Sequence, residues 1–395
     1  MSATATNAEL VEAAAGLFDT LRANAEQADL DRQLPKDSVQ AIGQAGLFRV
    51  WNARRYGGAE ADVKTQMLVT TELARACSSA GWVTGVITGS HWMAHSLPDR
   101  ATAEIWGDNP DALVSGNVTP HPVVVPETDG GYVISGRWGF GSGGGHSDWL
   151  YMPILVMEDG APNVRFCFAP RSEFTIEDTW HVLGMRGTGS NTMVADNVFV
   201  PEHRTYPLLG PKGAMNGVTR KGHQDEELYR CPFGMIGGAT LCGTFLGIAE
   251  AAFDHLVQTL PTRPISYSNY LTSSASVGTQ LDIAEARTRL DMATLLAHRL
   301  ADDCTAAGRA GVLPSDTLRA RARHDCAVVA RETRGVVDLL ARLGGASGAA
   351  EGSLLNRLYR DISTASLHGV TNTATTQESY GAALLGEPIT STSFL

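Results

Sequence analysis

The chain has 395 residues, more than a single hydrophobic core usually supports, so two or three packed domains are expected. Hydrophobic residues make up 43% of it and charged residues 18%, a composition that allows a large interior and excludes a disordered polymer. The formal net charge of -11 argues against nucleic acid and anionic membranes as partners, because both bind cationic surfaces.

The pattern of apolar residues begins as a helical one. Residues 1–112 carry apolar side chains at spacings of three and four, which predicts a helical N-terminal domain. Residues 113–206 instead contain short runs rich in Val, Ile, Tyr, Trp and Phe, separated by Gly, Pro, Asn and Asp. This pattern predicts a central β domain, with strands at 131–138, 148–156, 164–169 and 192–200.

The second half of the chain returns to helical spacing. Residues 207–235 are rich in Gly, Pro and charged residues, which predicts a connector or lid. Residues 236–395 predict a four-helix bundle, because four long helices with short connections favour antiparallel packing. The helices are expected at 239–258, 276–307, 316–343 and 354–385. The order of helices, strands and helices indicates the α+β class.

The cysteines and the first residues bear on the cellular compartment. The six cysteines lie far apart without a C-x-x-C pair, so we expect buried, reduced thiols and no metal site. The first residues lack a cationic start followed by an apolar core, and we find no run of about 20 apolar residues. These features predict a cytoplasmic protein without a membrane span.

Two motifs in the predicted β domain resemble the signatures of the acyl-CoA dehydrogenase superfamily. The first is Gly136-Arg-Trp-Gly-Phe-Gly-Ser142-Gly, followed by His146-Ser-Asp-Trp149. The second is Trp180-His-Val-Leu-Gly-Met-Arg-Gly-Thr-Gly-Ser190-Asn-Thr, which runs into Asp196-Asn-Val-Phe-Val-Pro201. Together with the order of the domains, the resemblance covers nearly the whole chain and implies the acyl-CoA dehydrogenase fold.

The same resemblance implies a flavin site in the β domain. Phe140 falls where the family places a ring against the flavin, and Trp180 is assigned to the same site. Ser142 falls where the family places a hydroxyl that bonds flavin N5. A hydroxyl both donates and accepts, so it can serve oxidised and reduced flavin alike. The alternative for Ser142 is a turn serine in a glycine-rich loop.

Two segments of the bundle resemble the part of the family that holds the rest of the cofactor. Arg263 matches an arginine that meets the flavin phosphates from a neighbouring subunit, a task that suits its planar fork. Gly344 and Gly345 match a turn where backbone approaches the cofactor closely. The alternatives are a solvated loop arginine and a helix C-cap.

The chain departs from the dehydrogenases in its last helices. Those enzymes typically carry Tyr-Glu-Gly-Thr shortly after an Arg-Asp pair. Here Arg360-Asp361 is followed by His368 in place of the tyrosine and Gly369 in place of the glutamate. Proton abstraction next to a thioester needs a positioned carboxylate, which glycine does not supply. A dehydrogenase with its base at Glu250 or Glu285 remains an alternative.

With Trp82, His91 and Trp92 in the N-terminal helices, this pattern is similar to the two-component flavin monooxygenases of the same fold. That branch includes the oxygenase component of p-hydroxyphenylacetate hydroxylase. The resemblance implies that a separate reductase, bound transiently, delivers reduced FAD or FMN. With O2 as co-substrate and no metal, a flavin C4a-hydroperoxide then hydroxylates a small phenolic or indole-type aromatic. It also implies a homotetramer.

Within that mechanism Ser142, His368 and His91 have expected roles. Ser142 would bond N5, and His368 would donate a hydrogen bond to the peroxide. His91 would orient or deprotonate the substrate, because histidine titrates near the working pH, with Trp82 and Trp92 beside it in the substrate site. The alternatives are a packed helix histidine for His91, an interface histidine for His368, an N- or S-oxygenase, and a flavin-free scaffold.

Overall fold

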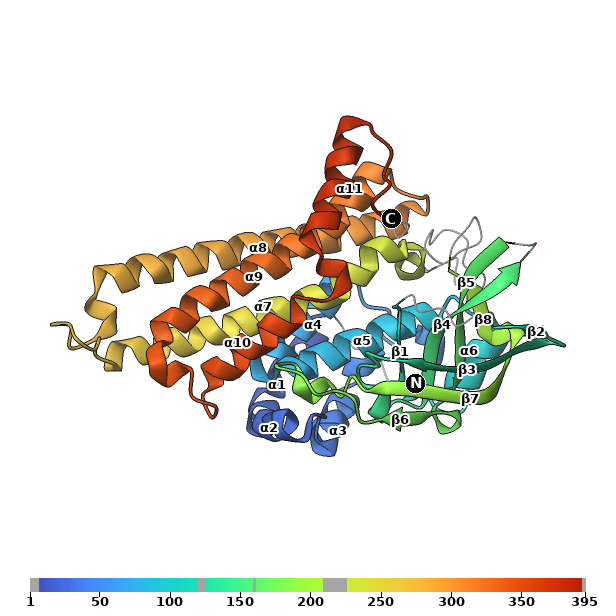
Figure 1. Cartoon of the computed structure of the whole chain (residues 1–395), viewed down its shortest axis with the longest axis horizontal. Coiled ribbons are helices and arrows are strands. Elements are labelled where there is room, and N and C mark those ends of the chain that lie inside the picture. The colour runs from blue at the N-terminus through green and yellow to red at the C-terminus, as the bar shows by residue number, and fades with distance from the viewer. Residues whose placement is uncertain (1–6, 120–124, 159–160, 209–225, 393–395) are drawn as a thin grey trace.

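The computed structural model describes residues 7–119, 125–158, 161–208 and 226–392. Helices come first, strands follow, and long helices form the second half, which confirms the predicted α+β order (Figure 1). The N-terminal helices are α1 (Asn7–Gly16), α2 (Phe18–Asp31), α3 (Lys36–Gln44), α4 (Val63–Ala76), α5 (Ser78–Ala94) and α6 (Asp99–Trp106).

The strands form two sheets. The strands are β1 (Val114–Gly116), β2 (Glu127–Thr128), β3 (Gly131–Trp138), β4 (Trp149–Glu158), β5 (Ala161–Pro170), β6 (Thr175–Glu177), β7 (Thr192–Pro201) and β8 (Thr205–Pro207). One sheet has the order β1-β4-β5-β8 and the other β2-β3-β7-β6. The inward side chains of β3 and β4, such as Ile134, Trp138, Leu150 and Met152, fill the core of this part. The four strands predicted from residue content and turn residues coincide closely with β3, β4, β5 and β7.

The C-terminal helices are α7 (Phe233–Thr259), α8 (Val277–Ala310), α9 (Asp316–Gly348), α10 (Leu354–Ala365) and α11 (Thr373–Leu385). Four of them, α7 to α10, lie side by side along the molecule, and α11 points away from them (Figure 1). By length and composition alone α7 would suffice to cross a membrane, although the sequence pattern predicted no such run. Its apolar stretch is 83% buried by the other helices, so α7 is the core helix of the bundle.

The fourth helix of the predicted bundle is in fact broken. It was expected to run from 354 to 385, but α10 ends at Ala365 and α11 begins at Thr373. The Thr371 hydroxyl donates to the Ser366 carbonyl, and Asn372 caps α11 by accepting from the Thr375 amide at 3.1 Å. These bonds satisfy polar groups of the segment between the two helices. His368 lies in this segment, directly before a short 3-10 turn at 369–371.

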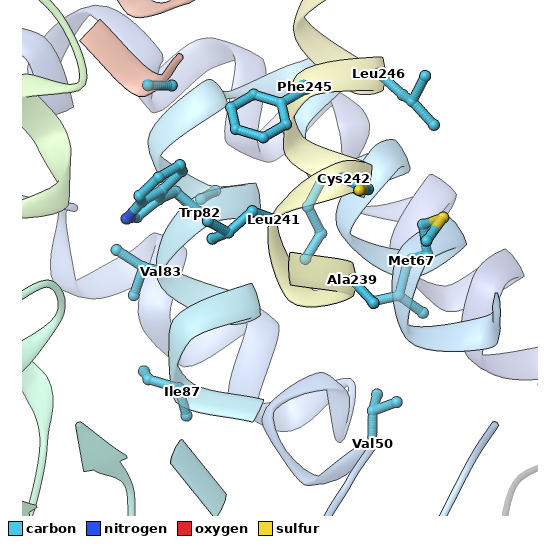
Figure 2. Packing of buried hydrophobic residues seen from close by; sticks show 14 of the residues in the cluster. Val50, Met67, Trp82, Val83, Ile87, Ala239, Leu241, Cys242, Phe245 and Leu246 are labelled. Atoms are coloured by element: carbon cyan, nitrogen blue, oxygen red, sulfur yellow. The ribbon is translucent and has the colours of Figure 1, made fainter. Parts of the chain in front are cut away.

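The N-terminal helices pack on the bundle through α4, α5 and α7 (Figure 2). A Cβ at Gly243 of α7 would lie 2.3 Å from the Met67 carbonyl oxygen of α4, so only glycine allows this contact. The six cysteines are buried and unpaired, as expected. The predicted connector at 207–235 lies largely outside the described residues, which resume at 226.

Candidate active site

Two glycine-containing loops, one from each sequence motif, are joined by backbone hydrogen bonds. The Gly141 amide donates to the Asn191 carbonyl at 3.1 Å, and the Gly143 amide donates to the Thr188 carbonyl at 3.0 Å. The residues between these two bonds, Ser142 in one loop and Ser190 in the other, therefore face each other. The two motifs that are some forty residues apart in the sequence thus form one structural unit.

A chain of hydroxyl groups runs through this unit. Ser142 Oγ lies 2.6 Å from Ser190 Oγ, which lies 2.7 Å from Thr188 Oγ1. Thr188 Oγ1 donates to the Met185 carbonyl oxygen at 2.8 Å. All three hydroxyl residues are buried. Buried polar groups that are fully hydrogen-bonded hold a fixed geometry, so Ser142 is a rigid part of the fold.

Trp82 of α5 links this chain to the helices. Its indole Nε1 donates to Ser142 Oγ at 3.2 Å, and its ring lies edge-on to Phe245 of α7 with centroids 6.3 Å apart. In Figure 2 the Trp82 side chain projects from α5, with Phe245 and Leu241 of α7 near it. This apolar packing excludes water from one side of Ser142.

His368 contacts the same indole. Its ring centroid is 5.6 Å from that of Trp82, in an edge-on arrangement. Its Nδ1 accepts from the Val370 amide at 3.3 Å, so in the neutral ring the hydrogen is on Nε2. Burial lowers the pKa of His368 to about 4, which keeps the ring neutral at pH 7. His368 therefore presents a neutral N–H donor.

Phe140 and Trp180 form an apolar rim on this unit. Phe140 is 64% exposed, and its backbone has a φ of 61°, which is uncommon for a residue with a side chain. The Trp180 ring lies edge-on to it with centroids 6.0 Å apart, and its Nε1 donates to the Met185 carbonyl. An exposed ring held by an unusual backbone conformation is suited to contact a planar ligand.

The second motif is anchored on α10. The Met185 amide donates to Asp361 Oδ1 at 2.6 Å, and the Gly184 amide donates to Thr364 Oγ1 at 3.0 Å. A Cβ at Gly184 would lie 2.0 Å from the Arg360 carbonyl oxygen, so this contact requires glycine. Burial raises the pKa of Asp361, while its bond to the Met185 amide opposes that rise. Asp361 thus fixes the loop that carries Thr188 and Ser190.

His91 and Trp92 lie apart from this unit. His91 follows Trp82 by nine residues of α5, about 14 Å along the axis and on the opposite face. His91 is fully buried beside Trp106, and its Nε2 accepts from the Val114 amide at 3.2 Å. The Trp92 indole is also buried and donates to the Leu228 carbonyl at 3.0 Å. Their assignment to the substrate site stays a prediction, and this geometry argues for structural roles.

The predicted phosphate-binding residues lie together, but far from Ser142. Arg263 Nη2 donates to the Gly344 carbonyl at 2.7 Å and to Ser347 Oγ at 2.9 Å. Gly345, with a φ of 58°, has no side chain to cover that guanidinium. From Phe245, beside Trp82, to the end of α7 the helix runs for about 20 Å, and Arg263 lies beyond that end. Within one chain, the cluster around Arg263 is therefore separate from the cluster around Ser142.

The two carboxylates considered as dehydrogenase bases are held in ion pairs. Both oxygens of Glu250 accept from Arg287, at 2.9 and 3.0 Å, and Glu285 pairs with Arg289 on α8. Among the described residues, no carboxylate hydrogen-bonds to Ser142, Trp82 or His368. This arrangement does not favour abstraction of a proton next to a thioester.

A cavity of about 720 Å³ lies elsewhere, between α8, α9 and α10. Charged side chains line it, and Ser142, Trp82 and His368 do not. The lining includes Glu285, Arg289, Arg334, Asp338, Arg342 and Tyr359. This cavity is therefore separate from the hydrogen-bonded cluster of Ser142, Trp82 and His368.

The sequence motifs contain several site residues to which they gave no role. Thr188 and Ser190 stand in the second motif but were not assigned a function, and Asp361 was noted only as part of an Arg-Asp pair. The contact of Phe245 with Trp82 could not be predicted from the sequence, because one aromatic residue in an apolar helix is usually part of the core. Only the fold brings these residues to Ser142.

The residues present fit a flavin. Ser142 Oγ and the His368 Nε2–H supply hydrogen-bonding groups beside the exposed Phe140 ring, a combination that suits a flat ring with polar edges. In the part of the chain that is described, His368 Nε2 has no hydrogen-bond partner. The Arg263 guanidinium beside Gly345 suits a phosphate.

The comparisons with known proteins agree with this arrangement. Residues 4–99 match the family model of the acyl-CoA dehydrogenase N-terminal domain, and residues 239–373 match that of the acyl-CoA dehydrogenase C-terminal domain. The predicted fold is thereby confirmed.

Proteins similar over their whole length carry out oxygenase chemistry. The chain is 31% identical over 380 residues to the oxygenase subunit HsaA of a flavin-dependent monooxygenase from Rhodococcus jostii, covering 95% of this chain and 98% of that protein. It is 30% identical to the oxygenase component of an FADH(2)-dependent resorcinol hydroxylase from Rhizobium sp., covering 95% and 94%. The structure of XiaF from Streptomyces sp. in complex with FADH2 and glycerol aligns with a TM-score of 0.91 at 30% identity, covering 97% and 96%.

Proposed function

This chain belongs to the flavin-dependent monooxygenases, as an oxygenase component with the acyl-CoA dehydrogenase fold, and we propose that it hydroxylates a small phenolic or indole-type aromatic compound. The observation that carries the proposal is the Ser142–Trp82–His368 cluster, in which neutral donors and acceptors replace the carboxylate that a dehydrogenase needs. The resorcinol hydroxylase among its relatives supports an aromatic substrate.

Reduced FAD or FMN, when bound, supplies the electrons with which O2 is activated so that one oxygen atom enters the substrate. Phe140, Ser142 and Trp180 would hold the ring system of this group. Ser142 would hydrogen-bond its N5, and the exposed Phe140 ring would pack on it. A separate reductase, which binds transiently, would deliver the group in its reduced form.

His368 acts as a neutral hydrogen-bond donor at this site. Its Nδ1 is bonded to the Val370 amide, and its pKa of about 4 keeps the ring uncharged across the physiological range. A neutral N–H stabilises developing negative charge on an oxygen atom without releasing a proton to it. The apolar side chains of Trp82 and Phe245 keep water away, which limits the loss of reducing equivalents as hydrogen peroxide.

We also propose that the protein is a homotetramer. Within one chain, roughly 20 Å of α7 lies between Phe245, which is beside Trp82, and the end of the helix, and Arg263 lies beyond that end. The Arg263–Gly344 cluster of one subunit would then bind the phosphates of a flavin held at Ser142 of another, as the family resemblance implies. A cytoplasmic location is proposed as well, supported by six buried cysteines without disulfides.

The function is tested with isotopic oxygen. The protein is mixed anaerobically with photoreduced FAD, then with 18O2 and one compound from a panel of phenols, indoles, amines and thioethers. We expect a hydroxylated phenol or indole that carries one 18O atom, detected by mass spectrometry. An oxygenated amine or thioether instead would favour the N- or S-oxygenase, and reduction of oxidised FAD by an acyl-CoA would favour the dehydrogenase. Failure to bind reduced flavin would refute the proposal.

A further inference from the structure

The hydroxyl chain at the candidate site has a fixed direction. A carbonyl oxygen only accepts hydrogen bonds, so Thr188 must donate its one hydroxyl hydrogen to the Met185 carbonyl at 2.8 Å. Thr188 then has no hydrogen left for Ser190, so Ser190 donates to Thr188 across 2.7 Å. The hydrogen of Ser190 is used in turn, so Ser142 donates to Ser190 across 2.6 Å.

The other end of the chain agrees with this direction. The Trp82 indole N–H can only donate, and it donates to Ser142 Oγ at 3.2 Å. Ser142 thus donates its one hydrogen to Ser190 and accepts from Trp82 with one lone pair. Because a hydroxyl oxygen has two lone pairs, a single acceptor position remains. Toward a ligand, Ser142 is a hydrogen-bond acceptor.

We propose that Thr188 and Ser190 make this site selective for the reduced form of the flavin, by fixing Ser142 as an acceptor. This inference rests on the proposed function. N5 of a reduced flavin carries a hydrogen and donates, whereas N5 of an oxidised flavin has only a lone pair. Ser142 therefore matches the reduced form and opposes the oxidised form. Thr188 and Ser190 are positioning residues, since they act through Ser142.

Reversal of Ser142 is costly in this setting. To donate to an oxidised flavin, Ser142 would have to withdraw its hydrogen from Ser190 and leave two oxygen lone pairs facing each other at 2.6 Å. Ser190 could not restore the bond by donating to Ser142, because it already donates its one hydrogen to Thr188. Both loops are also fixed by backbone bonds, and Asp361 holds Met185. A buried network of this kind resists rearrangement.

The inference is tested by binding rather than by turnover. Anaerobic isothermal titration calorimetry gives the Kd of oxidised FAD and of photoreduced FAD for the wild type and for each variant. In Ser190→Ala the Ser142 hydroxyl loses its acceptor and can donate to N5. We expect the ratio of the oxidised to the reduced Kd to fall about tenfold, the size of one hydrogen bond of ~1.4 kcal/mol. The midpoint potential of bound FAD should fall by about 30 mV.

Two matched pairs separate direction from loosening of the loops. Thr188→Val removes the acceptor of Ser190 and should also lower the ratio, whereas Thr188→Ser keeps the hydroxyl and should not. Ser147→Ala removes another buried hydroxyl, one that donates to the Gly143 carbonyl at 3.1 Å outside the chain, and should leave the ratio unchanged.

The outcomes distinguish this inference from the proposed function. Should both forms of FAD bind and the ratio stay the same in Ser190→Ala and Thr188→Val, the selectivity mechanism is wrong while the function stands. An equal fall in Ser147→Ala would likewise overturn it, since loop rigidity would then explain the effect. If the wild type binds neither form of FAD and neither form of FMN, both ideas fail.

Discussion

His91 offers a sharp test, because the sequence and the structure suggest different roles for it. Its Nε2 accepts from the Val114 amide, and burial lowers its pKa to about 3 from an ordinary value of 6.5. In the unfolded chain the ring binds a proton below pH 6.5, but in the folded chain it does so only near pH 3. His91 therefore destabilises the fold progressively as the pH falls from 6.5 towards 3.

The size of this effect follows from the two pKa values. Between pH 7 and pH 5, His91 alone should lower the free energy of unfolding by about 2 kcal/mol. We predict that His91→Gln, whose side-chain oxygen can still accept from the Val114 amide, removes this contribution and leaves that of His368 in place. Urea unfolding at pH 7 and pH 5, followed by tryptophan fluorescence, measures it.

The matched control is His181→Gln, which removes an exposed histidine and should keep the pH dependence of the wild type. At pH 7 the His91→Gln variant should also retain most of its hydroxylation activity. A large loss of kcat with an unchanged pH dependence of unfolding would refute the structural role and restore His91 as a base.

Three further predictions concern the site and its supports. His368→Ala should lower the ratio of hydroxylated product to hydrogen peroxide at least about tenfold, as expected for loss of one donor to a developing charge, whereas His368→Gln, which keeps an N–H donor, should retain part of it. Asp361→Ala should lower the free energy of unfolding by about 2 kcal/mol, because the buried Met185 amide loses its acceptor, and Asp361→Asn should cost less in the same urea assay. Arg263→Ala should weaken binding of reduced FAD about tenfold but leave reduced riboflavin, which has no phosphate, unaffected in calorimetry.

The strands could be predicted from the sequence because they are rich in Val, Ile, Tyr, Trp and Phe and are bounded by Gly, Pro, Asn and Asp. In β3, buried Tyr132 and Ile134 flank the half-buried Val133, whereas residues 150–154 of β4 are all buried. The two motifs likewise indicated Ser142 and Phe140 as candidate site residues, because the glycines around them mark tight turns. Local sequence patterns thus predict strands and turns, whose conformation depends on residues that are close together in the chain.

The role of His91 could not be predicted in the same way. Nearly every residue of α5 is buried, so its apolar pattern does not indicate which face meets the site. Trp82 and His91 look equivalent in the sequence, as polar-edged rings in one apolar helix. They differ because the nine residues from one to the other make about two and a half turns of α5, which puts the side chains on opposite faces, and because Val114 of β1 contacts the face that carries His91.

The break between α10 and α11 connects these observations. A continuous helix would carry His368 along its own axis, whereas the break allows Nδ1 to bond the Val370 amide and leaves Nε2–H as a donor beside Trp82. The preceding turn of α10 carries Asp361, which holds Met185 at the end of the hydroxyl chain. One short segment therefore positions both the donor and the support of the acceptor. Because the dehydrogenase glutamate would stand at Gly369 in this segment, exchanging that carboxylate for glycine and introducing His368 changes the chemistry of the site without moving the loops that hold Ser142.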